Sequence, residues 1–383
     1  MSTHREALII LHFQALEMYP PIMNIVTAAE KFGNDFNIHV VTNTSKLRLT
    51  NYKSQSSNIQ IVRVSRISEE DYLFIRLFKY VKFYFAGLFY LIRYRPKVVL
   101  YFETLSALPA LIYKIILKRG VHLFAHYHEY STLEEFRTGM ILNRFNHWLE
   151  NKLYKKFTWI SHTNALRLEK FRVDHQLASE SNVIFATMPN YPPRRWEAEP
   201  KSKELNTPYK LIMLGAIGYD NMYLKEIVEW VTATPTLFKL DFYSNNIDEK
   251  ARAYLSLFKN TNVALLDPID YDRIPEILEN YDIGLVIYKP FSENTIYAVS
   301  NKVFEYHVCG LDVWFPFEMV GTNPFIITRS YPKIVAIDYL RLNEMNINEV
   351  IDRGNLPKIK YQYYCEDVYQ YLYGKITKLI ITK

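Results

Sequence analysis

Short apolar runs alternate with helical patterns along almost the whole sequence of 383 residues, and this alternation constrains the fold more than any other feature. Runs of this length fit buried strands, and strands that alternate with helices form parallel sheets covered by helices. The first half predicts strands Ala7–His12, Ile38–Thr42, Ile59–Val64, Val98–Phe102, His122–Ala125, Thr158–Ile160 and Val183–Ala186. Helices are predicted between them, at 21–32, 107–118, 140–156 and 164–171.

A second series of strands and helices follows a segment rich in proline and charge, which predicts two domains. A chain of 383 residues is too long for one compact core. The second series has strands Lys210–Leu214, Leu237–Tyr243, Val263–Leu266, Ile283–Ile287 and Val313–Phe315. We therefore expect a first domain over 1–190, a linker over 191–207, a second domain over 208–355 and a C-terminal helix within 356–383.

Composition points to a globular cytoplasmic protein. Hydrophobic residues make up 49% of the chain. The two cysteines, Cys309 and Cys365, cannot form a disulfide framework and have no metal-ligand spacing, so a reducing compartment is expected. The first apolar run is too short for a signal peptide and is interpreted as a strand.

The net charge of +6 is unevenly distributed, because residues 72–102 contain no acid. Basic residues, among them Arg76, Lys79 and Lys82, alternate there with Phe and Tyr. One interpretation is a helix that lies on an anionic membrane surface. The other is a helix that packs its aromatic side chains on its own sheet, and the two are compatible on opposite faces. No apolar run reaches the roughly 20 residues of a membrane span, and no nucleic-acid-binding motif is present.

The segment from Ser300 to Val313 holds the clearest candidate for a ligand site. It predicts a short helix between two buried strands, with Ser300 as N-cap and Gly310 at the left-handed position after its end. Free amides at such a helix start bind phosphate. Asn301 and Glu305 are four residues apart and share one helix face. The pattern fits a nucleotide, with amides for the diphosphate and a carboxylate for the ribose; an ordinary capped core helix is the alternative.

This segment resembles the donor-binding motif of retaining group 1 glycosyltransferases, which have the GT-B architecture. The match is residue for residue at the positions Asn301, Lys302, Glu305, Tyr306 and Gly310. The resemblance implies two Rossmann-like, doubly wound domains facing across a cleft, with a nucleotide-diphosphate sugar on the second domain and a glycan or lipid-linked acceptor on the first. It also implies sugar transfer with retention, in the synthesis of cell-surface polysaccharide or glycoconjugate. We expect no cofactor and no metal, and the C-terminal helix is expected to cross back to the first domain.

Further candidate site residues stand at positions that correspond to functional elements of this family. His128 and Glu129 follow a strand where relatives place a His-Asp or His-Glu pair near the donor sugar, which makes them candidate catalytic residues. Tyr19 opens the first long helix, on the acceptor side. The remaining candidates belong to the donor site: Gly215 and Gly218 after a strand, Ile269 near the nucleobase, and Tyr297 near the sugar. For His128 a structural role is the alternative.

Departures from the family pattern leave other functions open. Ala216 stands where relatives have an Arg that binds the diphosphate, and Tyr297 stands where they have a Glu. These changes favour a non-catalytic subunit that binds nucleotide sugars or glycans. A nucleotide-sugar epimerase shares the architecture and is a third hypothesis. Asp270 and Asp272 match a short metal-binding pattern, but helix capping is the preferred interpretation.

Overall fold

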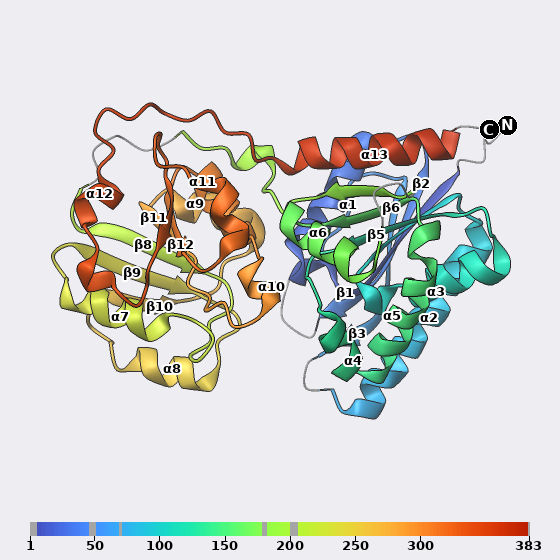
Figure 1. Cartoon of the computed structure of the whole chain (residues 1–383), viewed down its shortest axis with the longest axis horizontal. Helices are drawn as coiled ribbons and strands as arrows, with labels where there is room; N and C mark the ends of the chain where they lie inside the picture. The colour runs from blue at the N-terminus through green and yellow to red at the C-terminus, as the bar shows by residue number, and fades with distance from the viewer. Residues whose placement is uncertain (1–5, 46–50, 69–70, 178–181, 200–205, 382–383) are drawn as a thin grey trace. The chain divides into compact units, whose positions relative to one another are not determined.

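The computed structural model describes residues 6–45, 51–68, 71–177, 182–199 and 206–381. The chain divides into two compact units (Figure 1). The first comprises Met1–Pro189 and Cys365–Lys383, and the second Asn190–Tyr364. Among the described helices, none combines the length and the apolarity that crossing a bilayer requires.

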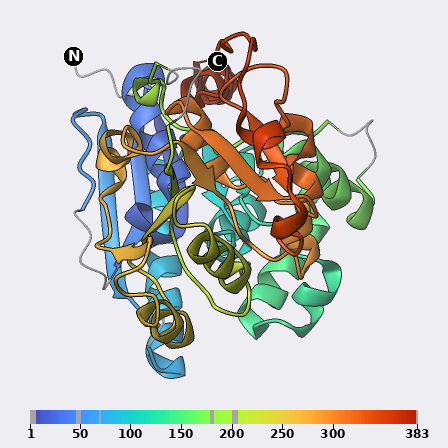
Figure 2. The same cartoon turned by 90° about the vertical axis from the view of Figure 1, so that its left-hand side faces the viewer.

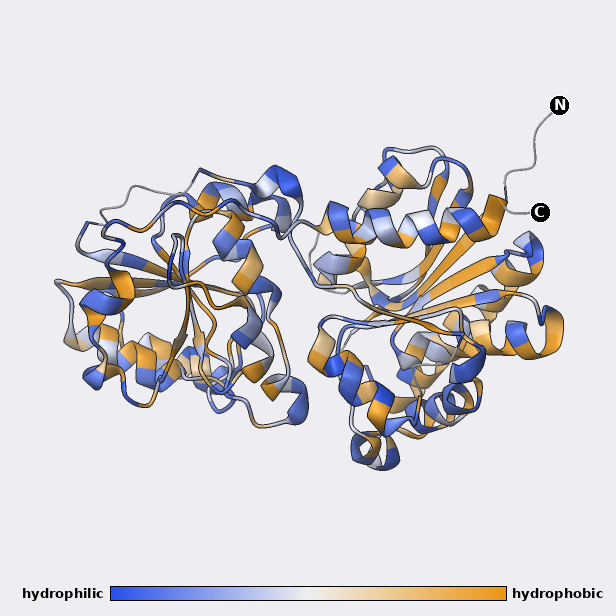
Figure 3. Cartoon of the chain, turned by 45° about the horizontal axis from the view of Figure 1, so that its top comes forward, coloured by the Kyte–Doolittle hydropathy of each residue, from blue (hydrophilic) through white to orange (hydrophobic). Residues whose placement is uncertain are grey.

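The first unit is built on a seven-stranded parallel sheet with the order β3-β2-β1-β4-β5-β6-β7. Its strands are hydrophobic along most of their length (Figure 3), as expected for strands buried on both faces. In register, His12 of β1 lies beside Phe102 of β4, which lies beside His126 of β5. The strands are β1 (Ala7–Ala15), β2 (Asn37–Ser45), β3 (Ile59–Ile67), β4 (Val98–Phe102), β5 (His122–Tyr127), β6 (Trp159–His162) and β7 (Ile184–Thr187).

Helices cover both faces of this sheet (Figure 1). One face carries α1 (Pro20–Phe32) and α13 (Cys365–Ile381), which pack against each other. The other face carries α2 (Leu73–Tyr94), α3 (Leu108–Ile112) with the π-helical turn η3 (Tyr113–Leu117), and α5 (Ile141–Leu153). The short α4 (Leu133–Thr138) precedes α5, and α6 (Ala165–Asp174) follows β6.

The second unit repeats the same topology with six parallel strands, in the order β10-β9-β8-β11-β12-β13. The helices α7 and α8 pack into one core, and α9 and α11 into the other, so the sheet lies between two helical layers (Figure 2). The strands are β8 (Tyr209–Leu214), β9 (Phe238–Tyr243), β10 (Val263–Leu266), β11 (Ile283–Leu285), β12 (Asp312–Pro316) and β13 (Ile334–Ile337). The helices are α7 (Leu224–Ala233), α8 (Glu249–Ser256), α9 (Ile274–Leu278), α10 (Glu293–Ile296), α11 (Asn301–Val308) and α12 (Ile347–Ile351).

The two doubly wound parallel sheets confirm the predicted fold class. The domain boundaries differ in detail, because the proline-rich segment is not a free linker. Trp196 is 2% exposed in the core of the second unit, and the Ala198 amide donates to the carbonyl of Val308 at 3.0 Å. Residues 200–205 of the predicted linker lie outside the described residues. The stretch 356–364, expected to belong with the last helix, belongs to the second unit.

Candidate functional site

In the second unit, α11 begins at the carboxyl end of β11, beside the point where the strand order reverses. Ser300 caps the helix, as predicted: its hydroxyl accepts from the amide of Lys302 at 3.3 Å. Gly310 follows the helix with φ of 87°, which confirms the predicted left-handed position. An eight-residue helix with this orientation presents its first amides at the ligand-binding edge of the sheet.

Glu305 is fixed inside the first turns of α11. Its side chain is almost fully buried. The Asn301 amide donates to one carboxylate oxygen at 2.6 Å, and the Lys302 ammonium contacts the other at 2.5 Å. The predicted common face of Asn301 and Glu305 is confirmed, and Lys302 joins it. Each carboxylate oxygen keeps a second lone pair, so the carboxylate can still accept a hydrogen bond from a ligand.

The loop after β8 meets this helix. The Tyr306 hydroxyl accepts from the amide of Leu214 at 2.8 Å, next to Gly215. Gly215 has φ of 126°, and a Cβ there would lie 3.9 Å from the Tyr288 hydroxyl. Burial and then the negative charge of Glu305 raise the pKa of Tyr288. Tyr288 therefore lies near both Gly215 and Glu305, and it is a residue that the sequence did not single out.

The other predicted donor residues lie on neighbouring loops. A Cβ at Gly218 would clash with the Asn221 side chain, so this glycine serves a tight turn. Ile269 is partly buried against the core that contains α11. Tyr297 ends α10, and its carbonyl lies against Gly321. Their contacts with a ligand remain predictions.

The capping interpretation of the two aspartates was wrong. Asp270 precedes the 3₁₀ turn Tyr271–Arg273, but its side chain makes no capping hydrogen bond. Asp272 forms an ion pair with Arg195 at 2.5 Å. This contact ties the predicted linker to the second unit.

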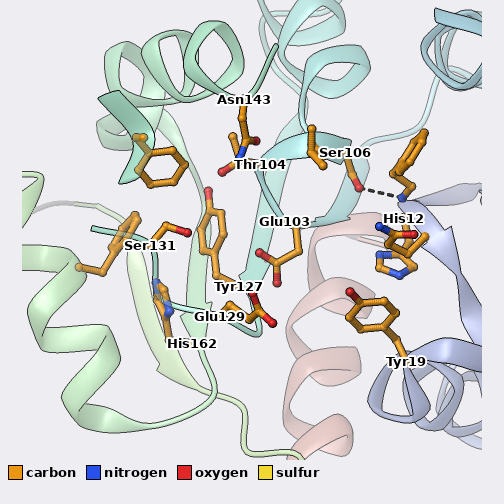
Figure 4. A pocket seen from close by; sticks show the side chains of 15 residues that line it. His12, Tyr19, Glu103, Thr104, Ser106, Tyr127, Glu129, Ser131, Asn143 and His162 are labelled. Carbon is orange, nitrogen blue, oxygen red and sulfur yellow. Dashed lines mark hydrogen bonds between the residues drawn. The ribbon is translucent and has the colours of Figure 1, made fainter. Parts of the chain in front are cut away.

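In the first unit, a pocket opens at the carboxyl ends of β1 and β4, where the strand order reverses. It holds about 850 Å³, including its open mouth. Such switch points are the usual ligand sites of doubly wound sheets. Figure 4 shows His12 and Tyr19 on one side, Tyr127, Ser131 and His162 on the other, and the carboxyl groups of Glu103 and Glu129 between them.

The structure thus brings two predicted residues, Tyr19 and Glu129, to one pocket with residues that the sequence did not indicate. Tyr19 is the residue before α1, and its ring lies edge-on to His12 with centroids 5.1 Å apart. Glu129 is exposed at the mouth. Glu103 directly follows β4 and was missed; an acid immediately after a buried strand is a signal that could have pointed to it.

The buried histidines around this pocket are electrically neutral near pH 7. Burial, and then the neighbouring His128, lowers the pKa of His12 well below its usual value. Burial similarly lowers the pKa of His162, helped by the charge of Arg167. Both side chains are 1% exposed and line the pocket. Neutral imidazole offers one donor and one acceptor, so these rings can bind a hydroxyl.

His128 lies at the end of β5, beside the pocket but not in its described lining. Its ring is 7% exposed and stacks on Phe102, with centroids 5.7 Å apart and planes 7° apart. It meets the ring of His126 edge-on at 4.5 Å and that of Tyr19 at 6.3 Å. The backbone of His128 supports its neighbours: its amide donates to Glu103 and its carbonyl accepts from Arg167. A catalytic role for this ring remains a prediction.

The basic, aromatic segment forms α2, and both interpretations of it apply to different faces. Tyr80, Phe83 and Tyr84 pack into the core of the first unit. The opposite face exposes large apolar side chains, among them Phe74 at 83% and Phe85 at 70%. Of the three predicted basic residues, Lys82 is exposed and Arg76 is half-buried.

The third, Lys79, was wrongly placed among the surface charges. Its ammonium forms an ion pair with the buried Asp71 at 2.5 Å. Asp71 lies just before the acid-free stretch, so the charge count along 72–102 could not show it.

Comparison with solved structures defines the class of fold. The chain is similar over 98% of its length to a sucrose-phosphate synthase from Thermosynechococcus elongatus, with a TM-score of 0.63, 12% identity and 97% of that chain covered. It is similar to HepE of Anabaena in complex with UDP-glucose, with a TM-score of 0.62, 9% identity, and 98% and 100% coverage. The fold is therefore GT-B, the architecture of group 1 glycosyltransferases.

The same fold also occurs in other nucleotide-sugar enzymes. The UDP-GlcNAc 2-epimerase of Methanocaldococcus jannaschii matches with a TM-score of 0.57 and 13% identity, over 97% of this chain and 99% of that one. No protein-family model matches the sequence, and no curated protein matches it. At identities this low, the likeness defines the architecture, and the reaction has to be argued from the residues.

Proposed function

We propose that the protein is a glycosyltransferase that moves a sugar from a nucleotide-diphosphate donor to a glycan or lipid-linked acceptor. The observation that carries this proposal is α11, whose capped first turn lies at the ligand edge of the second sheet with Glu305 clamped one turn inside. The first amides suit the diphosphate, and the fixed carboxylate suits the ribose hydroxyls. HepE, which has the same fold, was solved with UDP-glucose bound.

The proposed reaction proceeds with retention and without a metal or a protein nucleophile. The bond between the sugar and the diphosphate breaks as an oxocarbenium-like centre forms. The leaving phosphate oxygen takes the proton of the acceptor hydroxyl, and the new glycosidic bond forms on the same face. Catalysis is then positioning and charge stabilisation. His128 would donate a hydrogen bond to the charge that develops on the diphosphate. We place the reaction in cell-surface polysaccharide or glycoconjugate synthesis in the cytoplasm.

Nucleotide binding by the second unit tests the donor site. Calorimetry with a set of nucleoside diphosphates should identify one that binds. Glu305→Gln keeps the side-chain volume and loses the charge, so affinity should fall by roughly 1.5–3 kcal/mol, the value of a charged hydrogen bond. Glu229→Gln, an exposed carboxylate on α7, is the matched control and should bind like the wild type. Equal affinity in a folded Glu305→Gln protein would contradict the assignment.

Turnover separates the proposal from its alternatives. The epimerase hypothesis has support in the M. jannaschii structure, and the binding-subunit hypothesis in Ala216 and Tyr297. A transferase consumes donor only when an acceptor is supplied and forms a new glycoside. An epimerase interconverts the nucleotide sugar alone, and a binding subunit leaves it unchanged. Mass spectrometry of the donor, with and without an extract of acceptors, distinguishes the three.

We further propose that α2 holds the protein against an anionic membrane, where a lipid-linked acceptor resides. Its outward stripe of Phe74, Phe78, Phe85 and Phe89 is exposed and apolar, and exposed patches of this kind mark interaction sites. Lys82 and Arg93 flank it with positive charge and 72–102 adds no acid, which matches an anionic lipid surface. Sedimentation with acidic but not with neutral liposomes supports this; equal sedimentation with both contradicts it.

A further inference from the structure

Glu103 has a backbone conformation that an L-residue adopts only at a cost. Its φ is 62° and its ψ is 150°, a region populated almost only by glycine. Such a conformation costs on the order of 1–3 kcal/mol, and residues held this way are concentrated at functional sites. The surroundings enforce it: the Glu103 amide donates to the His126 carbonyl at 3.1 Å, and its carbonyl accepts from the Ser106 amide at 2.9 Å. The protein therefore has a Glu side chain at a position where glycine would adopt the same backbone conformation without strain.

This conformation places the Glu103 carboxyl group in the pocket. One of its oxygens accepts from the backbone amide of His128 at 2.6 Å, so its position is fixed from β5 as well as from β4. Figure 4 shows the Glu103 and Glu129 carboxyl groups directed into the same space, and Tyr19 and Tyr127 lie on either side. Glu103 is partly buried and keeps access to the pocket.

The pocket has an acidic lining, which decides the kind of ligand that fits. Two carboxyl groups line it, and its described lining contains no lysine or arginine. Arg167, whose charge acts on Glu103, is buried and donates to the carbonyl of His128. A phosphate or carboxylate would find no counter-charge here. Hydroxyl groups fit, because each can donate to a carboxylate and accept from a protonated acid or an imidazole.

Two buried imidazoles in the lining have unmet hydrogen-bonding capacity. Both ring nitrogens of His12 and both of His162 lack a partner within the described chain. Buried polar atoms are nearly always satisfied, so unpaired ring nitrogens in two residues that line a pocket call for a polar partner there, a ligand hydroxyl or a water. Aromatic rings of Tyr19, Tyr127 and Phe136 complete the walls. Polar groups between aromatic faces suit a sugar ring.

We propose that Glu103, together with Glu129, binds the hydroxyl groups of an uncharged sugar acceptor in this pocket. The proposal rests on the proposed transferase function and adds to it the class of acceptor and a substrate-contacting residue. The state of Glu103 agrees with it: burial, and next the charge of Glu129, raises the pKa of Glu103 to about 8. The amides of His128 and Glu129 and the charge of Arg167 oppose that rise. At pH 7 the Glu103 carboxyl group is therefore mostly protonated and both donates and accepts.

The test is direct binding of simple sugars to the full chain, observed by saturation-transfer NMR without any nucleotide. The probes are methyl glycosides of neutral hexoses, with glucosamine and glucose 6-phosphate as charged comparisons. We expect a neutral glycoside to bind and the phosphate ester not to bind. Glu103→Ala should weaken binding about tenfold, the effect of one lost hydrogen bond. Glu169→Gln, on the outer side of α6, is the matched control.

The pH dependence of sugar affinity distinguishes a ligand contact from a structural role, because a purely structural role of Glu103 would not change it. Wild-type affinity should fall as the pH rises above 8, because the ionised Glu103 carboxylate can no longer donate a hydrogen bond to a ligand oxygen. Glu103→Gln resembles that acid and keeps an acceptor for the His128 amide, so it should bind within about threefold of the wild type at pH 7 and show no change up to pH 9. Wild-type affinity in Glu103→Ala, tighter binding of glucosamine or glucose 6-phosphate, or equal pH dependence in Glu103→Gln would overturn the proposal.

The outcomes also separate this proposal from the proposed function. If nucleoside diphosphates bind and the Glu103 variants bind sugar as the wild type does, the acceptor assignment fails and the transferase proposal stands. If no nucleoside diphosphate binds and a neutral glycoside binds through Glu103, the sugar site stands and the transferase proposal fails.

Discussion

Replacing Glu103 by Gln should make the first unit more stable at neutral and alkaline pH. The folded protein holds this acid with its pKa raised to about 8, whereas the reference value is 4.5. The acid therefore binds its proton more tightly in the folded state than in the unfolded state. Its contribution to stability is fully present below pH 4.5 and is lost as the pH rises through 8. Gln is uncharged at every pH and is spared this loss.

The magnitude follows from the pKa difference. Each pH unit between the two pKa values changes the free energy of unfolding by about 1.4 kcal/mol. The full interval would give about 5 kcal/mol, and water in the open pocket reduces it, so we expect about 2–3 kcal/mol in favour of Glu103→Gln at pH 8. Near pH 4 the two proteins should have nearly equal stability.

Hydrogen exchange of β4 and β5 peptides, measured by mass spectrometry in increasing urea, reports on the first unit alone. The difference in unfolding free energy between Glu103→Gln and the wild type should grow from pH 4.5 to pH 8 and then level off. Glu169, which is exposed and pairs with Arg172, gives the control, since the effect of Glu169→Gln on stability should not grow as the pH rises towards 8. A difference for Glu103→Gln that is independent of pH would refute the reasoning, because it would mean that this carboxyl group is ionised in the folded protein.

Three other perturbations have defined outcomes. His128→Gln should reduce turnover far more than donor affinity, because its partner charge develops only in the transition state; equal losses in kinetics and calorimetry would support a structural role. Lys79→Gln should leave sedimentation with acidic liposomes unchanged once the protein is folded, since Lys79 pairs with Asp71, whereas Lys82→Gln with Phe78→Ser should reduce it. Burial lowers the pKa of His307 to about 3, so stability is lost as the pH falls below 6.5; His307→Phe should flatten this loss in urea unfolding of the second unit, and parallel curves would contradict it.

Local features of the site could be predicted from the sequence because their physics is local. The spacing of Asn301 and Glu305 fixes a common helix face, and the hydrogen bond of 2.6 Å confirms it. Gly310 was assigned a left-handed conformation from its position after the helix, and φ of 87° agrees. The strand Val98–Phe102 was predicted residue for residue, since five apolar side chains in a row fit a strand buried on both faces.

Features that depend on strand order could not be predicted in this way. Glu103 becomes a pocket residue only because β4 lies between β1 and β5, and nothing in its own segment fixes those neighbours. The strand β13 was missed because it is short and follows Pro332 and Lys333, residues that favour a loop. In the structure Lys333 is buried, and its ammonium donates to three carbonyls at the end of α12. The carbonyls that satisfy this buried ammonium belong to residues 16 to 19 positions later in the chain, so the local sequence could not indicate them.

The last helix also sets the order in which the chain can fold during synthesis. On α13, Tyr369 and Tyr373 donate to the carbonyls of Pro21 and Ile25 on α1. The first unit therefore lacks one covering helix until α13 has left the ribosome, whereas the second unit is complete at Tyr364. Domains usually mature from the N-terminus onward. In this protein the second unit can complete its fold before the first. The side of α1 that packs on α13 stays exposed while the 175 residues Asn190–Tyr364, which separate the two parts of the first unit, are translated.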